Sequence, residues 1–227
     1  MPAMPRDLPT PPPERLFLPG PVGRLAATWE RPAAPPRGLV LHLHPHPEHG
    51  GTRRNNVVRH GALGALEAGC GALRIDFRGV GRSEGSYDQG VGEVEDGAAA
   101  LTWLRIRHPG LPVFVWGFSF GAMVGLKLAA RQAASCAGFL AVAWPTRFYS
   151  WPDLPGPAWP RRSAFLAGDA DEFVDLDRYE PVRARRARLE ILPGADHFFR
   201  GRLAEVRRFT ADTLTAWLRE EGRATAG

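Results

Sequence analysis

Short apolar runs alternate with longer amphipathic stretches along most of the chain. Each run is apolar on both faces, which is typical of a parallel strand buried inside a sheet. Most of the runs end in Gly, Pro or a polar turn. We therefore expect strands at Gly38–Leu43, Gly71–Asp76, Pro112–Gly117, Ala137–Ala143, Ser163–Ala167 and Ala187–Leu192.

Apolar residues recur at helical spacing between these runs. The spacing predicts helices over Asn55–Glu67, Gly92–His108 and Ser119–Ala133, and a C-terminal helix with an apolar stripe from Leu203 to Leu218. The Ser119–Ala133 segment is apolar nearly all round, so we expect that helix to be buried. Strands and helices that alternate in this way predict the α/β fold class with a parallel sheet.

The N-terminal segment differs from the rest, because eight of the 22 prolines lie in the first 21 residues. Proline limits both helix and strand, so residues 1–21 are expected to be an irregular arm. Residues 22–227 then form a single domain, in which Val22–Trp29 alternates loosely and could be an edge strand. The first residues contain no apolar run of the kind found in a secretory signal peptide.

Composition supports one ordinary globular domain. Hydrophobic residues make up 44% and charged residues 23%, which excludes disordered, collagen-like and coiled-coil chains. No apolar run approaches the roughly 20 residues of a membrane-spanning helix, so no membrane partner is expected. Cys70 and Cys136 cannot form a disulfide framework, and we expect two buried small side chains in a cytoplasmic protein.

The net charge of +5 suggests nucleic acid at first sight. However, Lys127 is the only lysine, and the arginines are scattered along the sequence rather than concentrated in a stripe. We therefore expect no nucleic-acid partner. One local group of arginines is interpreted as a solvated helix or loop face, with a basic site for a partner as the alternative: Arg183, Arg185, Arg186 and Arg188.

The sharpest local signal is the segment Val115–Gly121, in which a strand runs through Gly-x-Ser-x-Gly into a helix. A nucleophile at such a tight turn has a strained backbone, and the glycines on either side of Ser119 let the chain pass. The helix N-terminus adds positive partial charge and free N–H groups. Ser119 is thus the candidate nucleophile, and the Phe120 N–H is one candidate oxyanion donor.

A serine hydroxyl needs a base that is oriented by a carboxylate, and each should follow a late strand. His197 is the only histidine after His108, so it is the candidate base. The carboxylate is not fixed by periodicity, since four acidic residues lie close together: Asp169, Asp171, Glu172 and Asp175.

With these residues in place, the chain resembles the α/β-hydrolase superfamily from about Leu39 to the C-terminal helix. It is most similar to small capless bacterial hydrolases related to dienelactone hydrolases and serine aminopeptidase-like proteins. The motifs that carry the resemblance are His44–Gly51, Asp76–Ser83, Gly117–Gly121, Gly168–Asp171 and Gly194–Phe198.

The resemblance implies a doubly wound, mostly parallel sheet without a large cap domain. It also implies that the acid of the triad is Asp171, because in that family the G-x-x-D position carries it. Position 119 is serine where dienelactone hydrolases have cysteine and haloalkane dehalogenases have aspartate, which counts against both of those activities.

The second oxyanion donor should come from the loop after the Leu39–Leu43 strand. Pro45 and Pro47 have no N–H, so the His46 N–H is the best candidate in that turn. The same loop raises the alternative of a metal site, formed by His42, His44, His46 and His49 with Glu48. No cysteine or further carboxylate completes a ligand set, so we expect loop shaping, no metal and no cofactor.

The stretch between Ala143 and Ser163 is too short for a cap domain but is rich in tryptophan. Trp144 and Trp151 are candidate substrate-binding residues that would favour a hydrophobic or aromatic group. The alternative is that these tryptophans only hold the loop on the sheet edge.

The expected function is hydrolysis of a small-molecule carboxylic ester through an acyl-enzyme intermediate. One alternative is a peptidase or amidase on short peptides, for which Glu48 or Glu172 could bind the substrate's amino group. The other alternative is a non-catalytic binding protein on the same fold. The sequence leaves the oligomeric state open, including a homodimer.

Overall fold

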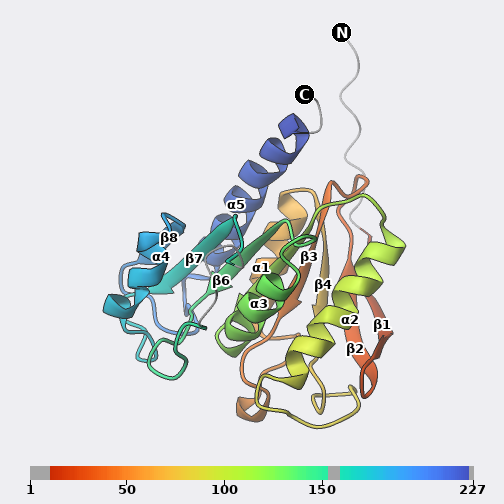
Figure 1. Ribbon diagram of the computed structural model, residues 1–227, viewed down its shortest axis with the longest axis horizontal. Helices are drawn as coiled ribbons and strands as arrows, with labels where there is room; N and C mark the ends of the chain where they lie inside the picture. Colours follow the sequence, from red (N-terminus) through yellow and green to blue (C-terminus); the bar gives the residue numbers. More distant parts are fainter. Residues whose placement is uncertain (1–10, 153–158, 225–227) are drawn as a thin grey trace.

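The computed structural model describes residues 11–152 and 159–224 of the 227-residue chain. Figure 1 shows one sheet with helices on both of its faces. The strands are β1 Glu14–Gly20, β2 Gly23–Glu30, β3 Gly38–Leu43, β4 Cys70–Ile75, β5 Val113–Phe118, β6 Gly138–Val142, β7 Ser163–Gly168 and β8 Arg188–Leu192. The helices are α1 Asn56–Glu67, α2 Gly92–Arg107, α3 Phe120–Arg131, α4 Glu180–Ala184 and α5 Leu203–Ala224.

The sheet has eight strands in the order β1-β2-β4-β3-β5-β6-β7-β8. β2 pairs antiparallel with both β1 and β4, and every other pairing is parallel. This confirms the doubly wound, mostly parallel sheet. The chain moves outward from β3 to β4 and then resumes on the other side of β3 with β5, and ligands of open α/β sheets bind where the order reverses in this way.

Apolar residues fill two cores, one on each face of the sheet. Figure 1 shows α2 and α3 on the near face, with α1 and α5 behind the sheet. The central strands β3 and β5 are completely buried, as their apolar runs predict. α3 is buried along almost its whole length, also as expected. Trp116 of β5 donates from Nε1 to Thr210 Oγ1 of α5 at 3.1 Å, which ties the sheet to the helix behind it.

The predicted boundary of the N-terminal arm is wrong for part of that segment. Residues 14–20 form β1, which pairs with β2 along its whole length, and β1 rather than β2 is the edge strand. Its only proline, Pro19, lies beside the hairpin turn on the edge of the sheet, where a missing N–H is tolerated. Residues 1–10 of the expected arm lie outside the described residues.

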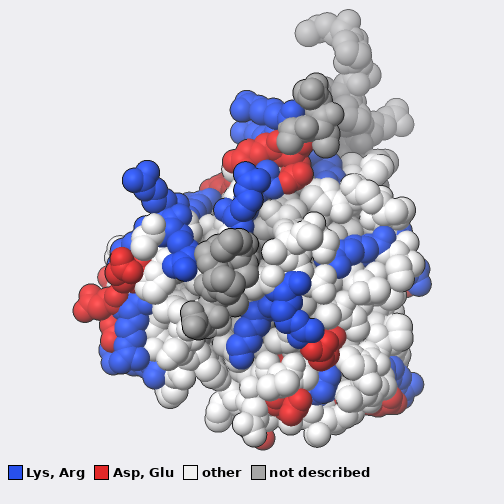
Figure 2. Space-filling view, viewed as in Figure 1, with Lys and Arg blue, Asp and Glu red and all other residues white. Residues whose placement is uncertain are grey.

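Charged side chains are spread over the surface rather than gathered in one stripe. Figure 2 shows Lys and Arg on this face in several patches, separated by acidic and uncharged surface. Many arginines pair with nearby carboxylates, as Arg131 does with Glu95 and Arg202 with Glu205. The four-arginine group around α4 is exposed, as a solvated face requires. None of the helices in the described ranges is both long and apolar enough to cross a lipid bilayer.

Both cysteines are free thiols. Cys70 is buried in β4, and burial raises its pKa to about 12. Cys136 is half-buried, and its Sγ donates to the Gly138 carbonyl. Cys70 is therefore the buried small side chain that the sequence predicts, whereas Cys136 is only partly buried.

Candidate active site

Ser119 lies at the turn between β5 and α3, at the carboxyl edge of the sheet. Its backbone has φ 55° and ψ −120°, a strained conformation for a residue with a side chain. The Ser119 N–H donates to the Val142 carbonyl at the end of β6, which fixes the turn against the neighbouring strand. This is the sharp strand-to-helix turn that the Gly-x-Ser-x-Gly segment predicts.

Two glycines make this turn sterically possible. A Cβ on Gly117 would lie 2.2 Å from the Gly121 carbonyl oxygen, and a Cβ on Gly121 would lie 2.3 Å from the Leu43 carbonyl oxygen. No side chain fits at either position without moving backbone. The second contact also presses the start of α3 against the end of β3, so the two loops that follow β3 and β5 lie side by side.

His197 and Asp171 reach Ser119 from loops that follow β8 and β7. His197 Nε2 lies 2.9 Å from Ser119 Oγ, and His197 Nδ1 lies 2.7 Å from Asp171 Oδ2. All three side chains are buried. With a neutral imidazole, the Nδ1–H donates to the carboxylate and Nε2 accepts from the serine hydroxyl. The structure thus brings these three predicted residues together.

The neighbouring acidic residues have other positions. Asp169 Oδ1 accepts the Gly194 N–H at 2.6 Å, and this bond closes the turn that leads to His197. Asp175 accepts the N–H of Asp177 and caps a short 3₁₀ helix at Leu176–Tyr179. Glu172 is exposed and does not line the cavity described below. Geometry therefore separates Asp171 from the other three residues, which sequence periodicity alone could not do.

The loop after β3 lies against the serine turn. A Cβ on Gly51 would lie 2.0 Å from the Pro45 carbonyl oxygen, so the loop folds back closely on itself. The ring of His46 lies 5.1 Å from the ring of Phe120, measured between centroids. Neither the His46 N–H nor the Phe120 N–H has an acceptor within the described ranges, and both residues line the same cavity as Ser119.

A buried ion pair anchors the far end of this loop. Arg53 pairs with Asp76, which follows β4, and its backbone N–H donates to the same carboxylate at 2.7 Å. Arg53 Nε also donates to Thr28 Oγ1 of β2 at 3.1 Å. Burial raises the pKa of Asp76 in spite of this guanidinium.

The histidines of the loop do not form a metal-binding group. His42 is buried against Trp116, and burial lowers its pKa to about 3. His44 Nε2 accepts the Phe77 N–H and its Nδ1–H donates to the Pro45 carbonyl, while burial lowers its pKa to about 4. In residues 11–152 and 159–224, no three His, Cys, Asp or Glu side chains are placed to hold a metal ion. The loop-shaping interpretation fits His44 in particular.

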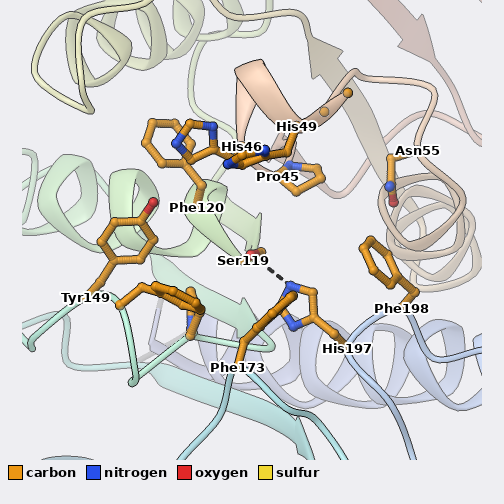
Figure 3. Close-up of a pocket in the computed structure, with 14 residues that line it drawn as sticks. Pro45, His46, His49, Asn55, Ser119, Phe120, Tyr149, Phe173, His197 and Phe198 are labelled. Atoms are coloured by element: carbon orange, nitrogen blue, oxygen red, sulfur yellow. Dashed lines mark hydrogen bonds between the residues drawn. The ribbon is translucent and has the colours of Figure 1, made fainter.

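Ser119 opens into a cavity of about 620 Å³ (Figure 3). Apart from Ser119 and His197, its polar side chains are those of His46, His49, Asn55 and Tyr149. No carboxylate, lysine or arginine is among the lining residues that the structure describes. The apolar wall is made by Pro45, Phe120, Pro145, Phe148, Phe173 and Phe198.

The tryptophans predicted to bind substrate do not line this cavity. Trp144 lies two residues after β6, is completely buried, and stacks on Trp151 at 4.3 Å between ring centroids. Trp144 Nε1 donates to the Tyr149 carbonyl, so the tryptophans hold the loop whose Tyr149 faces the cavity. The alternative role in loop packing is therefore the one observed. Glu48 is exposed and also lies outside the lining, where it donates its N–H to His46 Nδ1.

The sequence reasoning missed two of the aromatic residues that form the wall. Phe173 comes two residues after Asp171, and Phe198 comes directly after His197. Their rings flank the imidazole, with centroid distances of 4.7 Å and 5.2 Å. Both phenylalanines could have been placed at the cavity from their position in the sequence next to the candidate acid and base. Asn55 gave a signal only for a helix cap, and nothing in the sequence placed it at the cavity.

Comparisons with known proteins agree with this fold. The family model for the alpha/beta hydrolase fold matches residues 49–198. A serine hydrolase without a lid from Xanthomonas campestris is 32% identical, with a TM-score of 0.83 over 92% of this chain and 97% of that chain. An alpha-beta serine hydrolase homologue from Coxiella burnetii is 36% identical, with a TM-score of 0.81 over 88% of this chain and 97% of that chain. An uncharacterized protein of Rickettsia prowazekii is 34% identical over 210 residues, 88% of each chain.

Proposed function

Since the chain belongs to the α/β-hydrolase family, in which it is a small hydrolase without a lid, we propose that it cleaves carboxylic esters through an acyl-enzyme intermediate. The proposed catalytic residues are Ser119, His197 and Asp171. Their chemistry requires only the protein's own side chains and a water molecule. The substrate is a small molecule with an apolar acyl or alcohol group.

In the proposed reaction, Ser119 Oγ attacks the ester carbonyl while His197 Nε2 takes its proton. The tetrahedral intermediate collapses, the alcohol leaves with that proton, and the acyl group stays on Ser119. Water then attacks the acyl-enzyme with His197 again as the base, which releases the acid. Asp171 holds the imidazole in the tautomer that leaves Nε2 free to accept, and stabilises its charged form.

The unpaired N–H groups of Phe120 and His46 support an oxyanion hole. Both belong to residues that line the cavity beside Ser119, and neither is used by another protein group in the described ranges. Donors that are fixed before the reaction stabilise the negative charge of the tetrahedral intermediate without reorganising. The tight contact between Gly121 and Leu43 fixes the positions of the two loops that carry these N–H donors.

The cavity favours an ester over an aminoacyl amide. A positively charged amino group needs a carboxylate nearby, because an unpaired charge in a partly dry cavity is costly. Glu48 and Glu172 are both exposed outside the lining, and the described lining residues include no acid. The aromatic wall instead offers apolar contact to an alkyl or aryl group.

The single observation that carries this proposal is the chain of hydrogen bonds from Ser119 through His197 to Asp171, in which all three side chains are buried. The test is labelling by a fluorophosphonate probe together with hydrolysis of short p-nitrophenyl esters. Ser119→Ala should abolish labelling and lower kcat by at least about 10³-fold. Ser135→Ala makes the same change at an exposed serine in the turn after α3 and should leave both readouts unchanged.

Two results would contradict the proposal. If wild-type protein is not labelled and no ester is hydrolysed, the chain is a binding protein on this fold. If aminoacyl amides are cleaved with higher kcat/KM than esters of the same acyl group, the peptidase alternative holds.

A further inference from the structure

Asn55 is the N-cap of α1 and also lines the cavity that contains Ser119. Its Oδ1 accepts the N–H groups of Val57 at 2.9 Å and Val58 at 3.4 Å. These bonds fix which end of the amide is the oxygen, because only the oxygen can accept from a backbone N–H. They also use two of the free N–H groups at the start of α1, those of Val57 and Val58.

Within the described residues, the other end of the amide, Asn55 Nδ2, donates no hydrogen bond to a protein acceptor. The cap holds the side chain in place before any ligand binds, so the donor is preorganised rather than mobile. Figure 3 shows Asn55 and Phe198 on one side of Ser119, and Tyr149 on the other side.

We infer that Asn55 determines specificity by donating a hydrogen bond from Nδ2 to a neutral oxygen of the substrate. This inference rests on the proposed esterase function. The substrate class is an ester with a second oxygen, as an ether, hydroxyl or carbonyl group, on the part that lies away from Tyr149. Substrate binding displaces water from the cavity, and a buried donor without an acceptor is unfavourable, so esters that lack this oxygen are disfavoured.

A neutral oxygen fits this position better than a carboxylate does, because no permanently charged cation is among the described lining residues. The described lining residues include no arginine or lysine. Burial lowers the pKa of His46, and its ring is already engaged, with Nε2 within 3.1 Å of the Tyr87 hydroxyl. A single amide N–H is sufficient for an ether or carbonyl oxygen but not for a desolvated anion.

The test uses variants that keep the cap. Asn55→Asp and Asn55→Ser both retain an oxygen that can accept from the start of α1, since Asp and Ser are N-caps about as good as Asn. Both remove the amide donor, the first with a negative charge and the second without one. Asn56→Asp is the matched control, because it makes the same charge change at an exposed neighbouring residue outside the cavity lining. Thermal unfolding checks that all three variants fold.

The substrates are two pairs that differ by one oxygen in place of one CH₂. Butyl butanoate and 2-methoxyethyl butanoate differ in the alcohol part, while p-nitrophenyl pentanoate and p-nitrophenyl 3-methoxypropanoate differ in the acyl part. The readout is kcat/KM for the oxygen-containing ester divided by kcat/KM for its partner. This ratio cancels any general effect of a substitution on the reaction.

For one of the two pairs, both Asn55 variants should lower the ratio by about tenfold, mainly through KM, and Asn56→Asp should change it by less than about twofold. Unchanged ratios for both pairs, in variants whose Ser119 is still labelled by the fluorophosphonate probe, would overturn the role of Asn55 alone. Loss of labelling in the wild-type protein would instead overturn the proposed function, and the specificity inference with it.

Discussion

Asp171 holds His197 through a 2.7 Å contact between Oδ2 and Nδ1, and its other oxygen accepts the Phe173 N–H at 2.8 Å. The carboxylate is therefore fixed from both sides. The imidazole can neither rotate nor change its tautomer without breaking a buried hydrogen bond. The second contact also places Phe173 beside the imidazole, so one side chain orients both the proposed base and part of the cavity wall.

Asp171→Asn should lower kcat for ester hydrolysis by about 10³- to 10⁴-fold with little change in KM, because an amide that donates to Nδ1 favours the wrong tautomer. Steady-state kinetics with a p-nitrophenyl ester measures the effect. Asp169→Asn is the matched control, since it makes the same change two residues away on a carboxylate that bonds to the Gly194 N–H. A loss as large in the Asp169 variant as in the Asp171 variant would contradict this assignment.

Gly121→Ala should lower the free energy of unfolding by about 2–3 kcal/mol, because the new Cβ would meet the Leu43 carbonyl oxygen at 2.3 Å. Backbone has to move to relieve the contact, and the loop that carries His46 moves with it. Urea unfolding measures the loss. Gly222→Ala is the control: its Cβ would have no atom within 4 Å, and alanine is the better helix former, so α5 should become slightly more stable. Equal stability of the two variants would show that the close approach at Gly121 is not required.

Much of the fold could be predicted from the sequence because its signals are local. The buried parallel strands are continuous apolar runs, and β3 to β8 lie within one or two residues of their predicted bounds. The turn at Ser119 could be predicted because its glycines are a steric requirement of the turn itself. β1 was missed for the opposite reason: its prolines lie before the strand or at its hairpin end, so proline content was a poor guide to residues 14–18.

The site was predictable only as far as its chemistry is local. Ser119 and His197 follow from a motif and from chain order, whereas the choice of Asp171 depended on the resemblance and is visible in the structure as a contact. The tryptophans show what composition cannot reveal. A residue shortly after a buried strand, such as Trp144, can point into the core as easily as into a cavity. Its direction depends on packing that strand periodicity does not reveal, such as the stacking of its ring on Trp151.

Phe148→Ala should change substrate preference without unfolding the protein. The side chain is 66% exposed at the rim of the cavity and packs edge-on against Phe173, with ring centroids 5.4 Å apart. Its loss removes apolar contact for a long or aromatic acyl group, so kcat/KM for a p-nitrophenyl octanoate should fall by about 5- to 10-fold relative to the acetate. Trp151→Ala is the comparison variant. It should lower the melting temperature and leave the ratio of kcat/KM for the octanoate to kcat/KM for the acetate unchanged. If the octanoate-to-acetate ratio changes in the Trp151 variant and not in the Phe148 variant, the tryptophans would be the residues that bind the acyl group.

His42→Leu should make the protein more resistant to acid. Burial lowers the pKa of His42 to about 3 in the folded state, whereas an unfolded chain takes up the proton near pH 6.5. The folded state therefore binds fewer protons between these two values, so this stability contribution is present above pH 6.5 and is lost as the pH falls. The expected loss from His42 alone is about 2–3 kcal/mol between pH 7.5 and pH 4.5. Urea unfolding at the two pH values measures the loss of unfolding free energy. In the His42 variant this loss should be smaller by the same amount.

His49→Leu is the control for this experiment, because His49 is exposed and its imidazole meets water in both states. The substitution at His42 is tolerable in the folded state, since the ring lies against Trp116 and neither nitrogen makes a hydrogen bond of ordinary geometry. Replacing a buried polar ring by an apolar side chain of similar size is then close to neutral at pH 7.5. Equal losses of stability on acidification in the wild type and the His42 variant would show that other groups, such as His44 with a pKa near 4, dominate the acid sensitivity.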